Sequence, residues 1–103
     1  MTHLDFYQLA PEIDETTEWY LKEIIYCLIK YVGLNEEGAY DAVVTSDYLR
    51  RLLANEPLFL RTETAFYWAM HLSKEALWWH DEKRAAQSRE YMQERHHPPR
   101  GDK

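Results

Sequence analysis

His71, Glu75 and His80 are the residues whose types and spacing come nearest to a metal site. His71 and Glu75 are four positions apart, so on a helix both side chains can reach one ion. His80 lies nine positions after His71, which turns it about 180° away from His71 around the helix. A third ligand would therefore have to come from another element. These residues predict, as the weaker alternative, a metal-assisted hydrolase or a helical bundle that binds a small ligand.

Trp78 and Trp79 indicate instead a surface that binds another protein. Because they are consecutive, they point about 100° apart on a helix and cannot both face one core seam. One tryptophan is then exposed or at an interface, where this residue type is enriched, unless the helix is enclosed between two elements of its own domain. The residues expected to contact a partner are Trp78, Trp79, Lys83, Ala86, Glu90 and Tyr91.

Motifs for phosphate binding, hydrolysis and redox chemistry are absent from the chain. There is no glycine-rich phosphate loop, no G-x-S-x-G turn and no CxxC pair. The single cysteine, Cys27, lies in the apolar run IIYCLIKYV and is expected to be a buried, unreactive thiol. The pair His96–His97 is expected to be part of a polar tail. We therefore expect no cofactor and no catalysis.

Charge is distributed unevenly along the chain, whose formal net charge is −6. Residues 1–48 contain ten acids and two bases, whereas residues 49–103 contain eight acids and ten bases. An acidic front half argues against nucleic acid, because phosphate binding needs clustered Lys and Arg. The N-terminus shows no secretory signal, and no apolar run approaches the roughly 20 residues that span a bilayer. We expect a cytoplasmic protein that binds neither nucleic acid nor membranes.

The composition favours helices. Three glycines and four prolines in 103 residues are fewer turn residues than an all-β domain needs. The 46% of apolar residues is enough for one buried core. We expect a compact all-α domain of four to five helices over residues 1–95. Residues 96–103 should form a flexible tail, because Pro98 and Pro99 end any helix.

The first long helix is expected to begin at Pro11 and to run to about Val32, with Gly33 as its left-handed stop. Its polar positions form one narrow stripe, so this helix should lie at the centre of the core. The stripe consists of Glu18, Lys22, Tyr26 and Lys30. Residues 2–10 fit either a short helix or an extended arm. In both cases the chain would be anchored by Leu4, Phe6, Tyr7 and Leu9.

Asn35 and Ser46 are expected to cap two shorter helices that end near Val44 and Asn55. Pro57 then interrupts the helical pattern, because proline disfavours helix at the residue before it. The apolar residues that follow are expected to dock on the core as a plug. They are Leu58, Phe59 and Leu60.

Thr62 is expected to cap a single last helix that runs to about Arg95. The first half of this segment is rich in aromatic residues, while the second half, DEKRAAQSREYMQER, is polar but made of helix formers. The helix should therefore project beyond the core, and isolated helices of this length are marginal in water. The sequence predicts an interaction or regulatory module that binds another protein or a second copy of itself as a homodimer.

Overall fold

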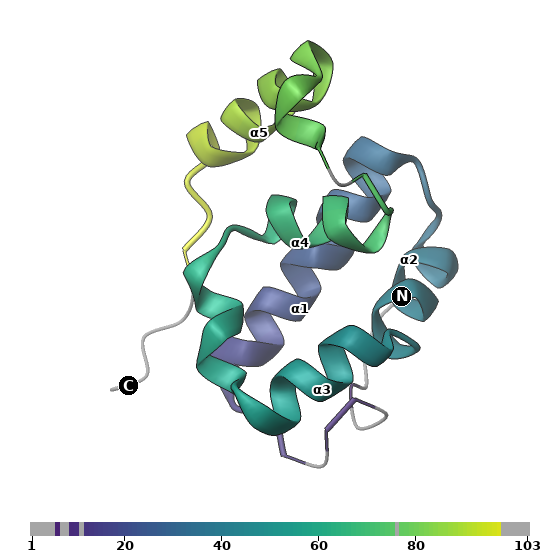
Figure 1. The fold of residues 1–103 in the computed structure, drawn as a ribbon, viewed down its shortest axis with the longest axis vertical. Coiled ribbons are helices and arrows are strands. Elements are labelled where there is room, and N and C mark those ends of the chain that lie inside the picture. The colour runs from purple at the N-terminus through teal and green to yellow at the C-terminus, as the bar shows by residue number, and fades with distance from the viewer. Residues whose placement is uncertain (1–5, 7–8, 11, 76, 98–103) are drawn as a thin grey trace.

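The computed structural model describes Phe6 and residues 9–10, 12–75 and 77–97, and within them the chain forms only helices and turns (Figure 1). The predicted all-α class is confirmed. The radius of gyration is 13.3 Å, close to the about 13 Å of a compact 100-residue domain. In chain order the elements are α1 (Glu15–Cys27), η1 (Leu28–Val32), α2 (Glu36–Val44), α3 (Asp47–Asn55), η2 (Pro57–Thr62), α4 (Ala65–Leu72), η3 (Trp78–His80) and α5 (Glu82–Gln93).

α1 begins later than predicted because Asp14 is its cap. The Asp14 carboxylate accepts a hydrogen bond from the backbone N–H of Thr17 at 2.8 Å, which satisfies a donor that the helix itself leaves free. The helix continues into η1, a single π-helical turn, and stops at Gly33. Gly33 has a φ of 92°, the left-handed conformation expected of it.

α1 lies at the centre of the core, as predicted. Figure 1 shows it crossing the middle of the molecule, and it packs against α4, α2 and η2. Its inward side chains are almost fully buried, and they continue into η1. They are Leu21, Ile24, Cys27 and Leu28. On the exposed stripe, Lys22 and Glu18 form an ion pair of 3.5 Å.

The predicted caps of α2 and α3 are confirmed. The Asn35 side chain accepts from the N–H of Gly38 at 2.7 Å, and the Ser46 hydroxyl accepts from the N–H of Leu49 at 3.1 Å.

The apolar plug after α3 is correct for Leu60 only. Leu60 is fully buried, and its carbonyl accepts from the Trp68 indole N–H at 2.9 Å. Leu58 and Phe59 are 67% and 43% exposed. Consecutive residues of a 3₁₀-helix point about 120° apart, so three in a row cannot all face the core.

The single helix predicted from Thr62 to Arg95 is wrong. The cap of α4 is Thr64, whose hydroxyl accepts from the N–H of Tyr67 at 3.1 Å. α4 ends at Leu72, where the Ser73 hydroxyl donates to the Ala69 carbonyl at 2.9 Å. Such side-chain bonds compete with the helical backbone. The chain then turns through the left-handed Lys74, at a φ of 63°.

α5 is a separate helix that folds back onto the protein. It starts at Asp81, whose carboxylate accepts from the N–H of Lys83 at 2.9 Å. Tyr91 and Ser88 are only 6% and 7% exposed, so one face of α5 is buried. The Tyr91 hydroxyl donates to Glu23 on α1 at 2.6 Å. The helix predicted to project beyond the core therefore packs against it instead.

The two ends of the chain are described only in part. Phe6 and Leu9 are both 4% exposed, so two of the four predicted N-terminal anchors are in the core. Leu4 and Tyr7 lie outside the described residues, as does most of the segment for which helix and arm were both possible. Residues 98–103 of the predicted tail also lie outside them.

Candidate functional site

A group of exposed aromatic side chains covers the buried Trp68 of α4. The rings of Tyr48 on α3 and Phe59 on η2 lie 6.1 and 6.0 Å from the Trp68 ring. The ring of His71, one helical turn after Tyr67, lies 4.5 Å from the ring of Tyr48 and is tilted by 43° to it. Side chains from α3, η2 and α4, three separate elements of the chain, thus meet around the indole of Trp68.

This group extends to the connection between α4 and α5. A cavity of about 70 Å³ is lined by Tyr67, His71, Glu75, Trp78 and Trp79. We define the aromatic surface as Tyr48, Phe59, Tyr67, His71 and Trp79. Three of its members are large side chains with 40 to 51% of their area exposed.

The two consecutive tryptophans divide between the core and the surface. Trp78 is half-buried and packs edge-on against Phe66, with 5.3 Å between ring centroids. Trp79 is 51% exposed. This division follows from the angle between neighbouring residues in a helical turn, which the sequence already indicated.

The remaining predicted partner residues lie on α5 and are not all available to a partner. Lys83, Ala86 and Glu90 are exposed, and Glu90 is 3.9 Å from Lys30. Tyr91 is a correction, because its ring is in the core and its hydroxyl is bonded to Glu23. Binding of a partner by Trp79, Lys83, Ala86 and Glu90 stays a prediction.

The candidate metal ligands are brought together only in part. His71 and Glu75 line the same small cavity, whereas the exposed His80 is not among its lining residues. The Glu75 carboxylate accepts two hydrogen bonds from Arg84, at 2.9 and 2.7 Å. Within the described ranges, no three His, Cys, Asp or Glu side chains are grouped closely enough to hold a metal ion.

Arg84 is a structural residue that sequence reasoning missed. Its side chain is only 16% exposed, and besides Glu75 it donates to the Tyr31 carbonyl and to Gln87, both at 2.9 Å. It therefore connects the start of α5 to the end of η1 and to the loop before Trp78. The nine-residue separation from Glu75 matches no helical period, so no local pattern could have indicated this pair.

A second hollow, of about 290 Å³, adjoins the aromatic surface at Tyr48. It is lined by the apolar Leu52, by the ring of Tyr48, and by Arg51, Asn55 and Glu56. Neither Arg51 nor Glu56 forms an ion pair with another described residue. The hollow thus combines apolar area with one free charge of each sign.

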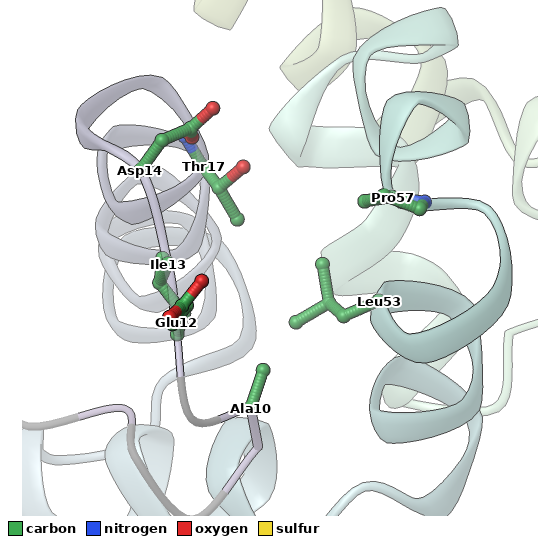
Figure 2. Close-up of a pocket in the computed structure, with 7 residues that line it drawn as sticks. All are labelled: Ala10, Glu12, Ile13, Asp14, Thr17, Leu53 and Pro57. Carbon is green, nitrogen blue, oxygen red and sulfur yellow. The ribbon is translucent and has the colours of Figure 1, made fainter.

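Another hollow, of about 420 Å³, lies between the start of α1 and the end of α3 (Figure 2). Figure 2 shows Leu53 and Pro57 facing Thr17 and two carboxylates across the gap. One of these, Asp14, already caps α1 and pairs with Arg61 at 2.9 Å. The backbone hydrogen bond from Thr17 is the main cause that lowers the pKa of Asp14. The described lining includes no His, Cys or Ser that could act with these acids in catalysis.

In the described part of the chain, no helix is both long and apolar enough to cross a membrane. Comparison of the chain with models of protein families, with curated proteins and with solved structures found no match.

Proposed function

We propose that the protein is a small helical interaction module that associates with a second copy of itself through the aromatic surface. The observation that supports this most directly is the continuity of Tyr48, His71 and the Trp79 cavity across α3, α4 and the loop before α5. Contiguous exposed apolar area on a small protein usually marks an interaction site. Tryptophan and tyrosine are also the residue types that most often dominate binding energy.

Charge at the edge of this surface favours a second copy as the partner. Arg51 and Glu56 line one hollow together with Tyr48, and both are free of ion pairs with described residues. In a two-fold symmetric interface the same surface is present on both sides. Arg51 of one copy can then lie opposite Glu56 of the other, while the aromatic rings meet near the axis. A partner of uniform charge would leave one of the two residues unpaired.

The alternative function, metal-assisted chemistry at His71, Glu75 and His80, has less support. The Glu75 carboxylate is bonded to the Arg84 guanidinium, which a metal ion would have to displace. His80 would also have to turn toward the cavity that His71 and Glu75 line.

Charge exchange tests the two-fold arrangement. Sedimentation velocity over a range of concentrations would give the association constant of the natural chain. Arg51→Glu and Glu56→Arg should each weaken association, because each places like charges opposite one another. The double variant should restore it, since the pair is then re-formed in reverse. Arg89→Glu, an exposed site on α5, is the matched control and should change little.

A further pair of variants separates the aromatic surface from the exposed face of α5. Trp79→Ala should weaken association and leave the free energy of unfolding within about 0.5 kcal/mol, as is usual for surface substitutions. Lys83→Glu should have no effect on association. A chain that stays monomeric at high concentration, or a double charge variant no better than either single one, would overturn the proposal.

A further inference from the structure

His96 lies between two carboxylates at the point where the chain leaves α5. Its Nδ1 is 2.7 Å from Glu23 Oε1 on α1, and its Nε2 is 2.7 Å from Glu94 Oε1. The ring stacks on Tyr91 at 5.0 Å and lies 5.2 Å from the ring of Tyr26. His96, which the composition places in a polar tail, thus contacts a carboxylate with each ring nitrogen and an aromatic ring with its face.

This geometry requires an imidazolium. A neutral imidazole has one N–H, and its other nitrogen carries a lone pair that can only accept. If His96 lost a proton, one ring nitrogen would present that lone pair to an ionised carboxylate oxygen at 2.7 Å, which is repulsive. Both short contacts with Glu23 and Glu94 are satisfied only when His96 has both ring protons.

The two carboxylates that contact His96, those of Glu23 and Glu94, also accept hydrogen bonds from other side chains. Glu94 also accepts hydrogen bonds from Lys30 and, at 3.1 Å, from the Tyr26 hydroxyl. These bonds, that of Lys30 foremost, lower the pKa of Glu94 to about 2. Glu23 is only 14% exposed and shares its Oε1 between His96 and the Tyr91 hydroxyl. Loss of the positive charge on His96 would leave Glu23 poorly solvated and without a cation in contact.

Lys30, Tyr26 and Tyr91 near the ring keep their protons over the range in which histidine titrates. The hydrogen bond with Glu94 raises the pKa of Lys30, while burial raises the pKa of Tyr26 and of Tyr91. Glu90 bridges to Lys30 from α5, at 3.9 Å. Histidine is the one side chain whose ordinary pKa falls between about pH 5 and 8. His96 is therefore the group through which a change of pH acts on this network.

The chain at this point is also held in a strained conformation. Arg95, between Glu94 and His96, has a φ of 57°, which disfavours a residue with a side chain. The Arg95 side chain lines a cavity of about 190 Å³ with Trp19, Tyr20 and Met92, and forms no ion pair with another described residue. The contacts of Glu94 and His96 therefore hold the backbone turn, and weakening them would favour its relaxation.

We propose that residues 94–97 form a proton-gated strap, closed by a doubly protonated His96 that joins Glu94 to Glu23 and released when His96 loses a proton. Release removes the ring that covers Tyr91 and Tyr26, so an aromatic seam between α5 and α1 becomes accessible. The strap is independent of the aromatic surface, which lies on α3, η2, α4 and the loop before α5.

The direction of the pH response follows from the contacts. Burial alone lowers the pKa of His96, but the hydrogen bond with Glu94 and the charge of Glu23 outweigh it, so the pKa lies above the ordinary 6.5. A group with a raised folded pKa contributes its full stabilisation below the ordinary value. That contribution is lost as pH rises through the folded pKa. The strap is therefore closed in mildly acidic solution and opens toward alkaline pH.

Nuclear magnetic resonance of the isotope-labelled full chain tests this proposal. The ring signals of His96 should titrate above the ordinary histidine pKa of 6.5. Backbone relaxation of residues 94–97 should indicate order at low pH and fast motion at high pH, with the same midpoint as the His96 ring. Signals of buried Trp68 should not change, which would show that the core stays folded.

Three variants make the assignment specific. Glu94→Gln should lower the His96 midpoint and the midpoint of strap release together, because the imidazolium loses the negative charge of one of its two carboxylate partners. His96→Gln should abolish the pH dependence of strap motion, whereas the matched control His97→Gln should preserve it. Equal backbone order of residues 94–97 at both ends of the titration would overturn the proposal. So would strap release that persists with an unchanged midpoint in His96→Gln.

Discussion

Replacing Arg84 with alanine should be the most destabilising change on the partly exposed side of α5. The guanidinium makes four hydrogen bonds, two to Glu75 and one each to the Tyr31 carbonyl and Gln87, and the side chain is 16% exposed. Alanine would remove all four and leave Glu75 without its cation. Because Arg84 joins η1, the loop before Trp78 and α5, its loss should loosen all three together.

Arg84→Ala should lower the free energy of unfolding by about 2–3 kcal/mol. Single hydrogen bonds to charged groups contribute about 1.5–3 kcal/mol, and breaking a fully buried ion pair costs about 3–5 kcal/mol. Glu75 is 33% exposed, so water can replace part of what it loses, and the lower end of these ranges applies. For a domain of this size each kcal/mol lowers the melting temperature by about 4–8 °C, so the fall should be about 10–20 °C.

Thermal and urea unfolding followed by circular dichroism would measure this cost. Arg89→Ala is the matched control, since Arg89 is an exposed arginine of the same helix, and its effect should stay within about 0.5 kcal/mol. A double-mutant cycle with Glu75→Ala should give a coupling energy of about 1 kcal/mol or more, because the pair is bidentate. An Arg84→Ala cost below about 1 kcal/mol, or fully additive effects, would refute the assignment of Arg84 as the residue that fixes α5.

Three further changes test other parts of the fold. Leu28→Ala should cost about 2–5 kcal/mol in urea unfolding, because Leu28 is 1% exposed in the central helix, and a cost below about 1 kcal/mol would contradict that position. Gly33→Ala should cost about 1 kcal/mol from backbone strain alone, since φ is 92° and no atom beyond Gly33 and its two chain neighbours lies within 4 Å of the added Cβ; an unchanged melting temperature would argue against the left-handed stop. The pKa of Glu94 is lowered from 4.5 to about 2, so the stabilisation from Glu94 is complete above pH 4.5 and lost as pH falls toward about 2. Acid unfolding of Glu94→Gln should lack this part of the pH dependence, and superimposable curves for the two chains would refute it.

Features of the fold that depend on neighbouring residues could be predicted from the sequence. Asn35 and Ser46 cap their helices with bonds to residues only three positions away, and Gly33 ends η1 by its own conformational freedom. The central position of α1 followed from the narrow polar stripe on its surface. In each case the cause lies within a few residues of the element that it determines.

The break between α4 and α5 could not be predicted in this way. Residues 73–81 include no glycine or proline, and most of them are compatible with a helix. Asp81 is a good N-cap and so a local signal for a new helix, but it also begins the polar run of helix formers that predicts one continuous helix. The Arg84–Glu75 pair closes this loop through contacts that no helical period indicates.

In the candidate site, too, features set by neighbouring residues were predictable and features set by distant contacts were not. Exposure of one of two consecutive tryptophans was predictable from helix geometry, and Trp79 is the exposed one. The aromatic surface was not predictable, because Tyr48, Phe59 and His71 belong to α3, η2 and α4 and meet only after those elements pack around Trp68. The contacts of His96 were missed because composition places it in a tail, while its partner Glu23 is on α1.

The polar contacts of α5 also explain why the proposed partner surface is not on that helix. The sequence has few apolar side chains after Asp81, and this scarcity predicts that α5 needs a partner to be stable. The helix is held instead at three points along its length: Arg84 at its start, Tyr91 in the core near its end, and His96 just beyond it. With these groups used inside the protein, the large aromatic side chains that stay exposed among the described residues are Tyr48, Phe59 and Trp79 of the aromatic surface. Self-association should therefore survive substitutions on the outer face of α5 and fail with those around Tyr48 and Trp79.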